Sequence, residues 1–180
     1  MRLLTLLLLL LAAPGWAQWS STVDKPAIGY LEAYDAGLSL GMATGGTYYE
    51  VTGLPVNRGY STGGSYVTTG SDAITIGTAG AGVYSIALSM SFEATTGEYH
   101  CDVHVNEGGG DEDTEIGFRR KIANSSDYGS ASGIGIWAGT DGAGVDAGDV
   151  FSVYCKAVAD GETMTIDHLH LVMTRVGGLP

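Results

Sequence analysis

The feature that most constrains the fold is an alternation of large and small side chains between residues 82 and 92. The large residues stand at every second position: Tyr84, Ile86, Leu88, Met90 and Phe92. A period of two is that of a β-strand, whereas a helix would spread these side chains around its circumference. The positions between them are small and uncharged: Val83, Ser85, Ala87, Ser89 and Ser91. We predict a strand with one face in the core and a neutral face suited to a second layer or a second subunit.

Composition indicates that the rest of the chain is also built from strands. Glycine occurs 29 times and proline 4 times, and Thr, Ser, Val and Ile are abundant. These residues favour strands and turns, so we predict an all-β sandwich or jelly roll of about ten short strands. Segments 27–34 and 39–43 are expected to pair around a turn. The other predicted strands are 47–51, 73–77, 83–92, 97–106, 114–123, 129–139, 150–159 and 162–176, with small edge strands in the loops of 53–70.

Residues 1–17 have the pattern of a cleaved secretory signal peptide. Arg2 precedes an apolar run that ends at Ala13, and small residues at Gly15 and Ala17 precede the expected cut. The run is shorter than the ~20 residues of a membrane-spanning helix, which leaves a retained interfacial anchor as the alternative. We expect an exported protein without membrane insertion, with a leader at 18–26, one domain at 27–176 and a tail at 177–180.

The charge of the chain excludes one class of partner. The formal net charge is −12, and removal of the signal peptide would take away the basic Arg2. Such a surface repels phosphate backbones and anionic membranes. We therefore expect no nucleic-acid partner, whereas divalent cations are plausible ligands.

The closing strand, 162–176, repeats the neutral-face pattern. Leu169, Leu171 and Met173 are expected to face the core. The outward positions are Ile166, His168, His170, Val172 and Thr174. Exposed, largely uncharged surfaces of this kind usually mark an interface, so we expect the protein to form oligomers.

Four short motifs resemble a known family. Segment 79–86 opens a central strand with Gly-x-Tyr, 132–134 gives a Ser-Gly step before an apolar strand, and 147–150 gives a Gly-Asp turn before the penultimate strand. A closing strand runs through 171–173. In this order the motifs resemble the globular head of complement's first component and the related tumour necrosis factor superfamily, including distant versions in bacterial secreted proteins and phage virions. The collagen stalk of vertebrate complement is missing.

The resemblance implies a ten-strand jelly roll of two antiparallel sheets that assembles as a homotrimer. The sheet holding strands 83–92, 132–138 and 164–175 would face the threefold axis. The residues expected at the trimer interface are Ser85, Ala87, Ser89, Ser91, Ile134, Ile136, His168, His170 and Val172.

The two cysteines, Cys101 and Cys155, both fall on positions expected to face the core. In the resembled topology their strands are neighbours, so a cross-strand disulfide is implied, and export permits it. The alternative is two buried free thiols that act as small hydrophobes.

Metal ligands are suggested by two histidine pairs and two acidic stretches. His100, Asp102 and His104 share an outward strand face, but residues two apart on a strand splay by ~6.6 Å and favour a solvated surface. Near a threefold axis, His168 or His170 could supply one ligand per subunit, with ordinary interface packing as the alternative. The candidate calcium ligands lie in the expected acidic loops, and they are Asp111, Glu112, Asp113, Glu115, Asp141, Asp146 and Asp149.

Motifs of common enzyme classes are missing from the sequence, including the Gly-x-Ser-x-Gly elbow, the phosphate-binding loop and His-Glu-x-x-His. We predict a non-enzymatic, secreted or periplasmic homotrimer that binds an unidentified extracellular ligand or assembles into a surface structure. The alternative is a phage virion or tail component of the same fold, and a less favoured one is a metal-dependent hydrolase.

Overall fold

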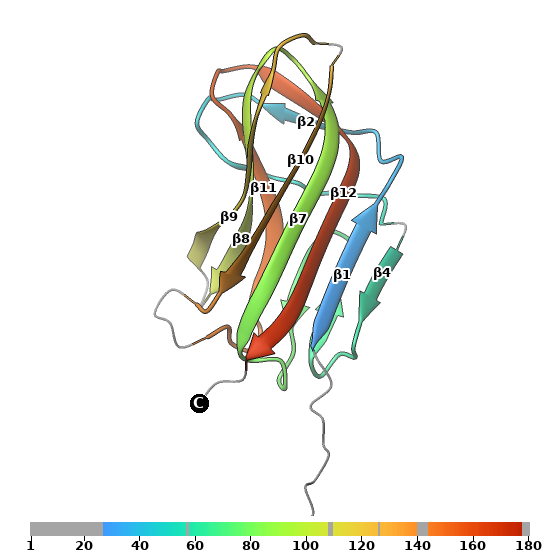
Figure 1. The fold of residues 1–180 in the computed structure, drawn as a ribbon, viewed down its shortest axis with the longest axis vertical. Coiled ribbons are helices and arrows are strands. Elements are labelled where there is room, and N and C mark those ends of the chain that lie inside the picture. The colour runs from blue at the N-terminus through green and yellow to red at the C-terminus, as the bar shows by residue number, and fades with distance from the viewer. Residues whose placement is uncertain (1–26, 57, 108–109, 126, 140–143, 178–180) are drawn as a thin grey trace, which may run out of the picture.

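The computed structural model describes residues 27–56, 58–107, 110–125, 127–139 and 144–177, and all the secondary structure in these ranges is β (Figure 1). The first sheet contains β1 (Ile28–Ala33), β2 (Leu38–Met42), β4 (Arg58–Ser61), β7 (Val83–Ala94), β10 (Tyr128–Trp137) and β12 (Glu162–Gly177). The second sheet contains β3 (Tyr49–Glu50), β5 (Val67–Thr69), β6 (Ala73–Ile76), β8 (Gly97–Glu107), β9 (Gly110–Ile122) and β11 (Val150–Ala157). The predicted signal peptide (1–17), leader (18–26) and residues 178–180 of the tail lie outside the described residues.

Every strand pairing in both sheets is antiparallel. The first sheet has the order β10-β7-β12-β1-β4 with β2 also on β12, and the second has β5-β6-β11-β8-β9 with β3 also on β11. The prediction of a two-sheet, all-β jelly roll is confirmed. The described residues form two strands more than the expected ten because β4 and β5 arise in 53–70, where small edge strands were expected. No helix that could cross a membrane occurs in the described part of the chain.

The core lies between the sheets and follows the alternation of the sequence. Along β7 the five large residues are buried, from Tyr84 to Phe92, and the residues between them are only partly buried. The hydroxyl of Tyr84 donates to the carbonyl oxygen of Gly80 at 2.5 Å, and burial raises its pKa to about 12. On β8 and β11 the predicted core residues Tyr99, Cys101 and Phe151 are fully buried. The hydrophobic alternation therefore sets which face of each long strand turns inward.

Two details of the first sheet differ from the prediction. The segments corresponding to β1 and β2 do not pair with each other; both pair with β12, one after the other along the same edge. Between these contacts β12 carries a β-bulge at Asp167, whose carbonyl oxygen accepts the amide N–H of Ala36 at 3.0 Å. A bulge shifts the alternation by one residue. Ile166, predicted to face outward, is consequently buried in the core.

The expected acidic loop from Glu107 to Asp113 is also shorter than predicted. β8 continues to Glu107 and β9 begins at Gly110, so Glu112 and Asp113 lie on a strand of a long hairpin. Their register partners on β8 are Val105 and His104.

β9 and β10 close one side of the sandwich by direct backbone contact. A Cβ atom at Gly133 would lie 2.0 Å from the carbonyl oxygen of Gly117, and a Cβ at Gly117 would lie 2.1 Å from the carbonyl oxygen of Cys101. Both distances are too short for any side chain, so glycine is required at these positions. At Gly133, β10 therefore lies directly against the backbone of β9.

Cys101 and Cys155 form a disulfide across β8 and β11. They are register partners with Cα atoms 4.1 Å apart, and both are completely buried. The alternative of two free thiols is excluded, because the described residues contain no free cysteine. The bond links segments separated by 54 residues.

Loss of the disulfide is expected to lower the free energy of unfolding by about 4 kcal/mol, because the cross-link restricts the unfolded chain over a loop of this length. Urea unfolding of the wild type with and without reductant measures this difference. The double variant Cys101→Ala/Cys155→Ala provides the control, since reductant should leave its unfolding midpoint unchanged. Equal stability of the oxidised and reduced wild type would contradict the prediction.

Candidate functional site

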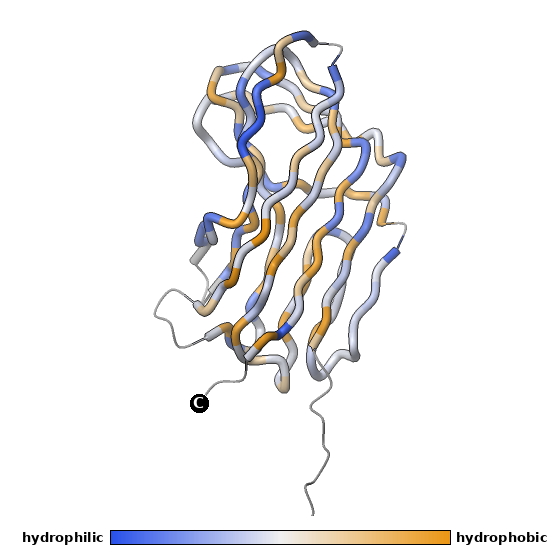
Figure 2. Tube along the Cα trace, in the orientation of Figure 1, coloured by the Kyte–Doolittle hydropathy of each residue, from blue (hydrophilic) through white to orange (hydrophobic). Residues whose placement is uncertain are grey.

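The candidate site is the outward surface of β10, β7 and β12, which we call the neutral face. Its side chains line up in rows across β12, β7 and β10: His168, Ser91 and Ser130; His170, Ser89 and Ser132; Val172, Ala87 and Ile134; Thr174, Ser85 and Ile136. None of these twelve residues is acidic, lysine or arginine. Figure 2 shows white to orange tones along most of β7, without the blue that marks charged positions elsewhere. All nine residues predicted for the trimer interface lie on this one surface.

Large apolar side chains project from the neutral face. Ile134 is 77% exposed and Ile136 is 69% exposed, both on β10. Tyr60, Tyr128 and Val176 of the same sheet are also more than half exposed. Beside the isoleucines the surface is hollowed: one shallow depression of about 290 Å³ lies over β7 between Ile134 and His170. A single subunit thus leaves apolar area in water next to a concave surface.

A polar cluster borders the neutral face where β1 joins β12. Glu32 is the register partner of His170, and one of its carboxylate oxygens lies 3.5 Å from Nε2 of His168. The hydroxyl of Tyr30 donates to the other oxygen at 2.5 Å. This hydrogen bond lowers the pKa of Glu32, and the nearby histidines and Arg58 act in the same direction. Negative charge is therefore held at the border of the face, beside the two histidines.

His170 is the partly buried member of this cluster. The ring of Tyr30 packs edge-on against its imidazole, with centroids 4.9 Å apart. Its Nε2 atom is shielded from solvent and has no hydrogen-bond partner among the described residues. Burial lowers the pKa of His170, the carboxylate of Glu32 raises it, and His168 lowers it further, with a net decrease. The neutral imidazole is consequently the favoured form in the fold.

The histidines of β8 lie on the outward surface of the second sheet and do not form one metal site. His100 contacts Glu98, with Nε2 3.3 Å from Oε1. Asp102 accepts a hydrogen bond from the hydroxyl of Tyr48. His104, expected in water, is 5% exposed because the rings of Tyr48 and Tyr154 pack against it with centroids 4.6 and 4.3 Å away. The three side chains of this strand face therefore have different partners.

The candidate calcium ligands are distributed over two places. Asp113 accepts the amide N–H of Glu115 at 2.8 Å and the hydroxyl of Tyr48 at 3.2 Å. Asp149 is buried and accepts the amide N–H of Asp146 at 2.8 Å. Asp141 lies outside the described residues, as does the side chain of Asp111. Within the described ranges no group of three or more His, Cys, Asp or Glu side chains could hold a metal ion, so calcium binding stays a prediction from sequence.

Two parts of these surfaces were not predicted from the sequence. Tyr30 and Glu32 lie on β1, far from β12 in the chain, and only the register of the sheet places them beside His168 and His170. Tyr48 belongs to the predicted strand 47–51 and lies just before β3 in the structure, and no motif marks it. The sequence marks Tyr30, Glu32 and Tyr48 only as polar residues in predicted strands. Many other residues of the chain fit that description, so it does not single out a site.

The described fold is similar to solved jelly-roll structures, among them one of a tumour necrosis factor. The crystal structure of murine APRIL at pH 5.0 matches with a TM-score of 0.56 and 16% identity, covering 84% of this chain and 100% of that chain. The structure of Eiger TNF from S. frugiperda matches with a TM-score of 0.57 and 11% identity, covering 87% and 96%. No protein-family model and no curated protein matches the chain. The resemblance inferred from sequence is confirmed for the fold.

Because the folded state disfavours the charged form of His170, acid is expected to destabilise the protein through this residue. Between the ordinary histidine pKa of 6.5 and the lowered folded value, the unfolded state binds more protons, so the free energy of unfolding falls as pH drops below 6.5. Urea unfolding from about pH 8 to pH 5 measures the slope. His170→Asn should flatten it, whereas His100→Asn, the same change on the other sheet, serves as the control. Identical slopes for the wild type and His170→Asn would refute the prediction.

Proposed function

We propose that the protein is an exported, non-enzymatic homotrimer whose subunits associate through the neutral face and whose outer surfaces bind an extracellular ligand or build a surface structure. The observation that carries the proposal is the neutral face itself. It is the outward surface of the first sheet, yet it displays Ile134 at 77% and Ile136 at 69% exposure among Ser, Ala, Thr and Val side chains. Exposed apolar patches on folded chains mark association surfaces.

The charge of the chain supports association at this place. Copies with a net charge of −12 repel one another over most of their surface. A face without acidic, lysine or arginine side chains is where two copies approach at the lowest electrostatic cost. Covering Ile134 and Ile136 would contribute about 1.5–3 kcal/mol for each side chain, and the small residues of β7 allow a second backbone to come close.

The shape of the face permits a ring of subunits. The isoleucines project from β10, at the edge of the sheet, while the depression lies over β7 toward β12. A projection that fits a depression on the next copy allows a head-to-tail contact, and such contacts form a ring where the rotation between copies closes. The family resemblance of the sequence implies a ring of three.

The disulfide supports export. Bonds of this kind persist in oxidising compartments and are rare in the reducing cytosol. The Cys101–Cys155 pair therefore agrees with the signal-peptide pattern of residues 1–17. A secreted or periplasmic location is the proposal that accounts for both features.

Ser89→Arg is expected to dissociate the trimer, because Ser89 lies in the central row of the neutral face and an arginine there would bury an unpaired charge. The wild type, residues 18–180, should scatter light with three times the monomer mass. The variant should show the monomer mass, with a dissociation constant raised by about 100-fold or more.

Thr68→Arg adds the same charge at an exposed position of β5 on the second sheet, and it should keep the trimer mass. Circular dichroism of both variants establishes that they are folded. A monomeric wild type at micromolar concentration, or a trimeric Ser89→Arg variant, would refute association through the neutral face.

A further inference from the structure

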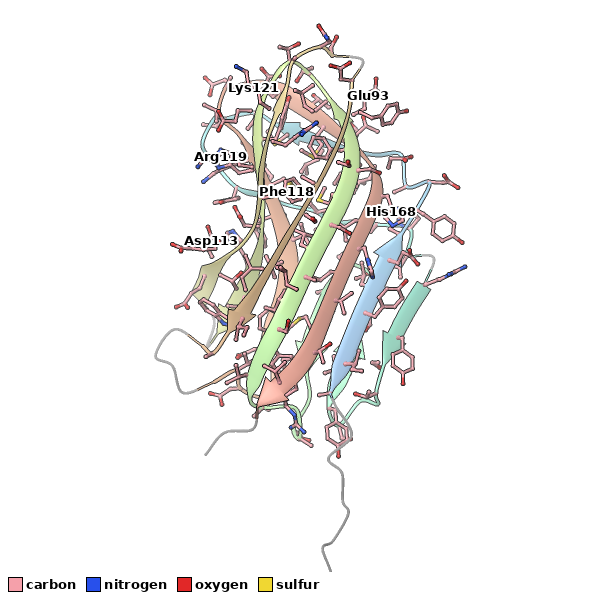
Figure 3. The ribbon with its side chains drawn as sticks, viewed as in Figure 1. Glu93, Asp113, Phe118, Arg119, Lys121 and His168 are labelled. Carbon is pink, nitrogen blue, oxygen red and sulfur yellow. A yellow bond between two sulfur atoms is a disulfide. The ribbon has the colours of Figure 1, made fainter. Side chains whose placement is uncertain are left out.

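The outward surface of the second sheet holds a polar hollow of about 370 Å³ beside β9. Its charged lining comes from three strands: Asp102 from β8, Asp113, Glu115 and Arg119 from β9, and Lys156 from β11. Figure 3 shows Asp113 and Arg119 at the β9 side of the molecule, away from His168. The size is at the lower end of the range for small-molecule sites.

Gly117 is part of the lining of the hollow. Gly117 is the register partner of Asp102, so β9 presents bare backbone there between Glu115 and Arg119. Beside it, the register of β8 and β9 shifts between Val103 and His104, and Glu115 has a left-handed φ of 57°. Such a conformation is unfavourable for a residue with a side chain, and here it is held by the hydrogen bond from the Glu115 amide to Asp113. The bulge turns the acidic side of β9 toward the hollow.

Tyr48 also lines the hollow and contacts charged side chains from three strands. Its hydroxyl contacts the carboxylates of both Asp102 and Asp113, and the amine of Lys156 lies 3.9 Å from the centre of its ring. Burial and these two carboxylates raise the pKa of Tyr48, so it stays a neutral donor. The positions of two carboxylates and one ammonium group are thus set by one side chain before any ligand arrives.

The charges of the lining select against charged ligands. Three carboxylates, the basic groups of Arg119 and Lys156, and the imidazole of His100 line the hollow. A small anion would therefore meet the three carboxylates. A small cation would meet the positive charges of Arg119 and Lys156. A neutral molecule with several hydroxyl groups satisfies both kinds of group, because each hydroxyl donates one hydrogen bond and accepts others. Hydrogen bonds to charged partners are the stronger ones.

We propose that this hollow binds a neutral saccharide, with Asp113 and Glu115 accepting hydrogen bonds from its hydroxyl groups while Arg119 and Lys156 donate to them. The proposal names a ligand class for the binding role proposed above. The hollow lies on the second sheet, so association through the neutral face leaves it open, and each subunit carries a complete site.

The test is titration of the isotope-labelled mature protein, followed by NMR, with glucose, galactose, mannose, fucose, N-acetylglucosamine and lactose. We expect at least one sugar to shift the amide signals around Gly117, Arg119 and Lys156, with a dissociation constant of about 1 mM or tighter. Inorganic phosphate and free lysine are the charged probes, and they should leave these signals in place at the same concentrations.

Matched variants assign the binding to the hollow. Arg119→Gln/Lys156→Gln should weaken binding by about 10-fold or more, since two charge-assisted hydrogen bonds are lost. Arg120→Gln/Lys121→Gln makes the same two replacements on β9 outside the hollow and should change affinity by less than about 2-fold. Binding by none of the sugars, preference for phosphate or lysine, or equal loss in both double variants would overturn the proposal.

The outcome is independent of the proposed assembly. Ser89→Arg should keep the saccharide affinity of the wild type whether or not it dissociates. A trimer without saccharide binding would refute only the ligand class, and a monomer that binds saccharide would refute only the trimer.

Discussion

The structure depends on the pairing of β7 with β12 at the centre of the first sheet. These two long strands put Leu88 opposite Leu171 on the core side, and Ser89 opposite His170 on the outward side. The remaining strands add to this pair: β10 on one side, and β1 and β2 on the other. Since side chains alternate strictly along a strand, the same register that fills the core also fixes the composition of the neutral face. The core and the candidate interface are therefore two consequences of one strand pairing.

Most of the fold could be predicted from the sequence because period-two alternation is a local property. Which strands pair with each other was harder to predict. The segments of β1 and β2 looked like a hairpin, and only the length of β12 shows that one strand can pair with both in succession. Ile166 was placed on the wrong face because a bulge inserts one residue without any marking in the local sequence. His104 was expected in water because nothing local indicated that Tyr48 and Tyr154 would cover it.

The candidate sites also include some that could be predicted from the sequence and some that could not. The neutral face could be predicted because small residues at Ser85, Ala87, Ser89 and Ser91 share one strand. The polar cluster of Glu32 with the β12 histidines could not, since it joins strands from opposite ends of the domain. The hollow beside Gly117 is lined by residues from four segments of the chain. A feature that lies on one strand can be predicted from the sequence. A feature that depends on the register between strands can be identified only once the sheet is known.

The backbone contact of Gly117 with Gly133 sets the thickness of the sandwich at its β9–β10 side. Elsewhere in the core, a change of one methyl group can be absorbed by rotation of neighbouring side chains. At Gly133 an added Cβ atom would meet the backbone of Gly117, which cannot rotate away as a side chain can, so the two sheets would be forced apart. Gly117 borders the hollow, and Gly133 adjoins Ile134 of the neutral face. The hollow and the neutral face are thus held at a fixed separation by this glycine contact. Even the smallest substitution at Gly133 would change that separation.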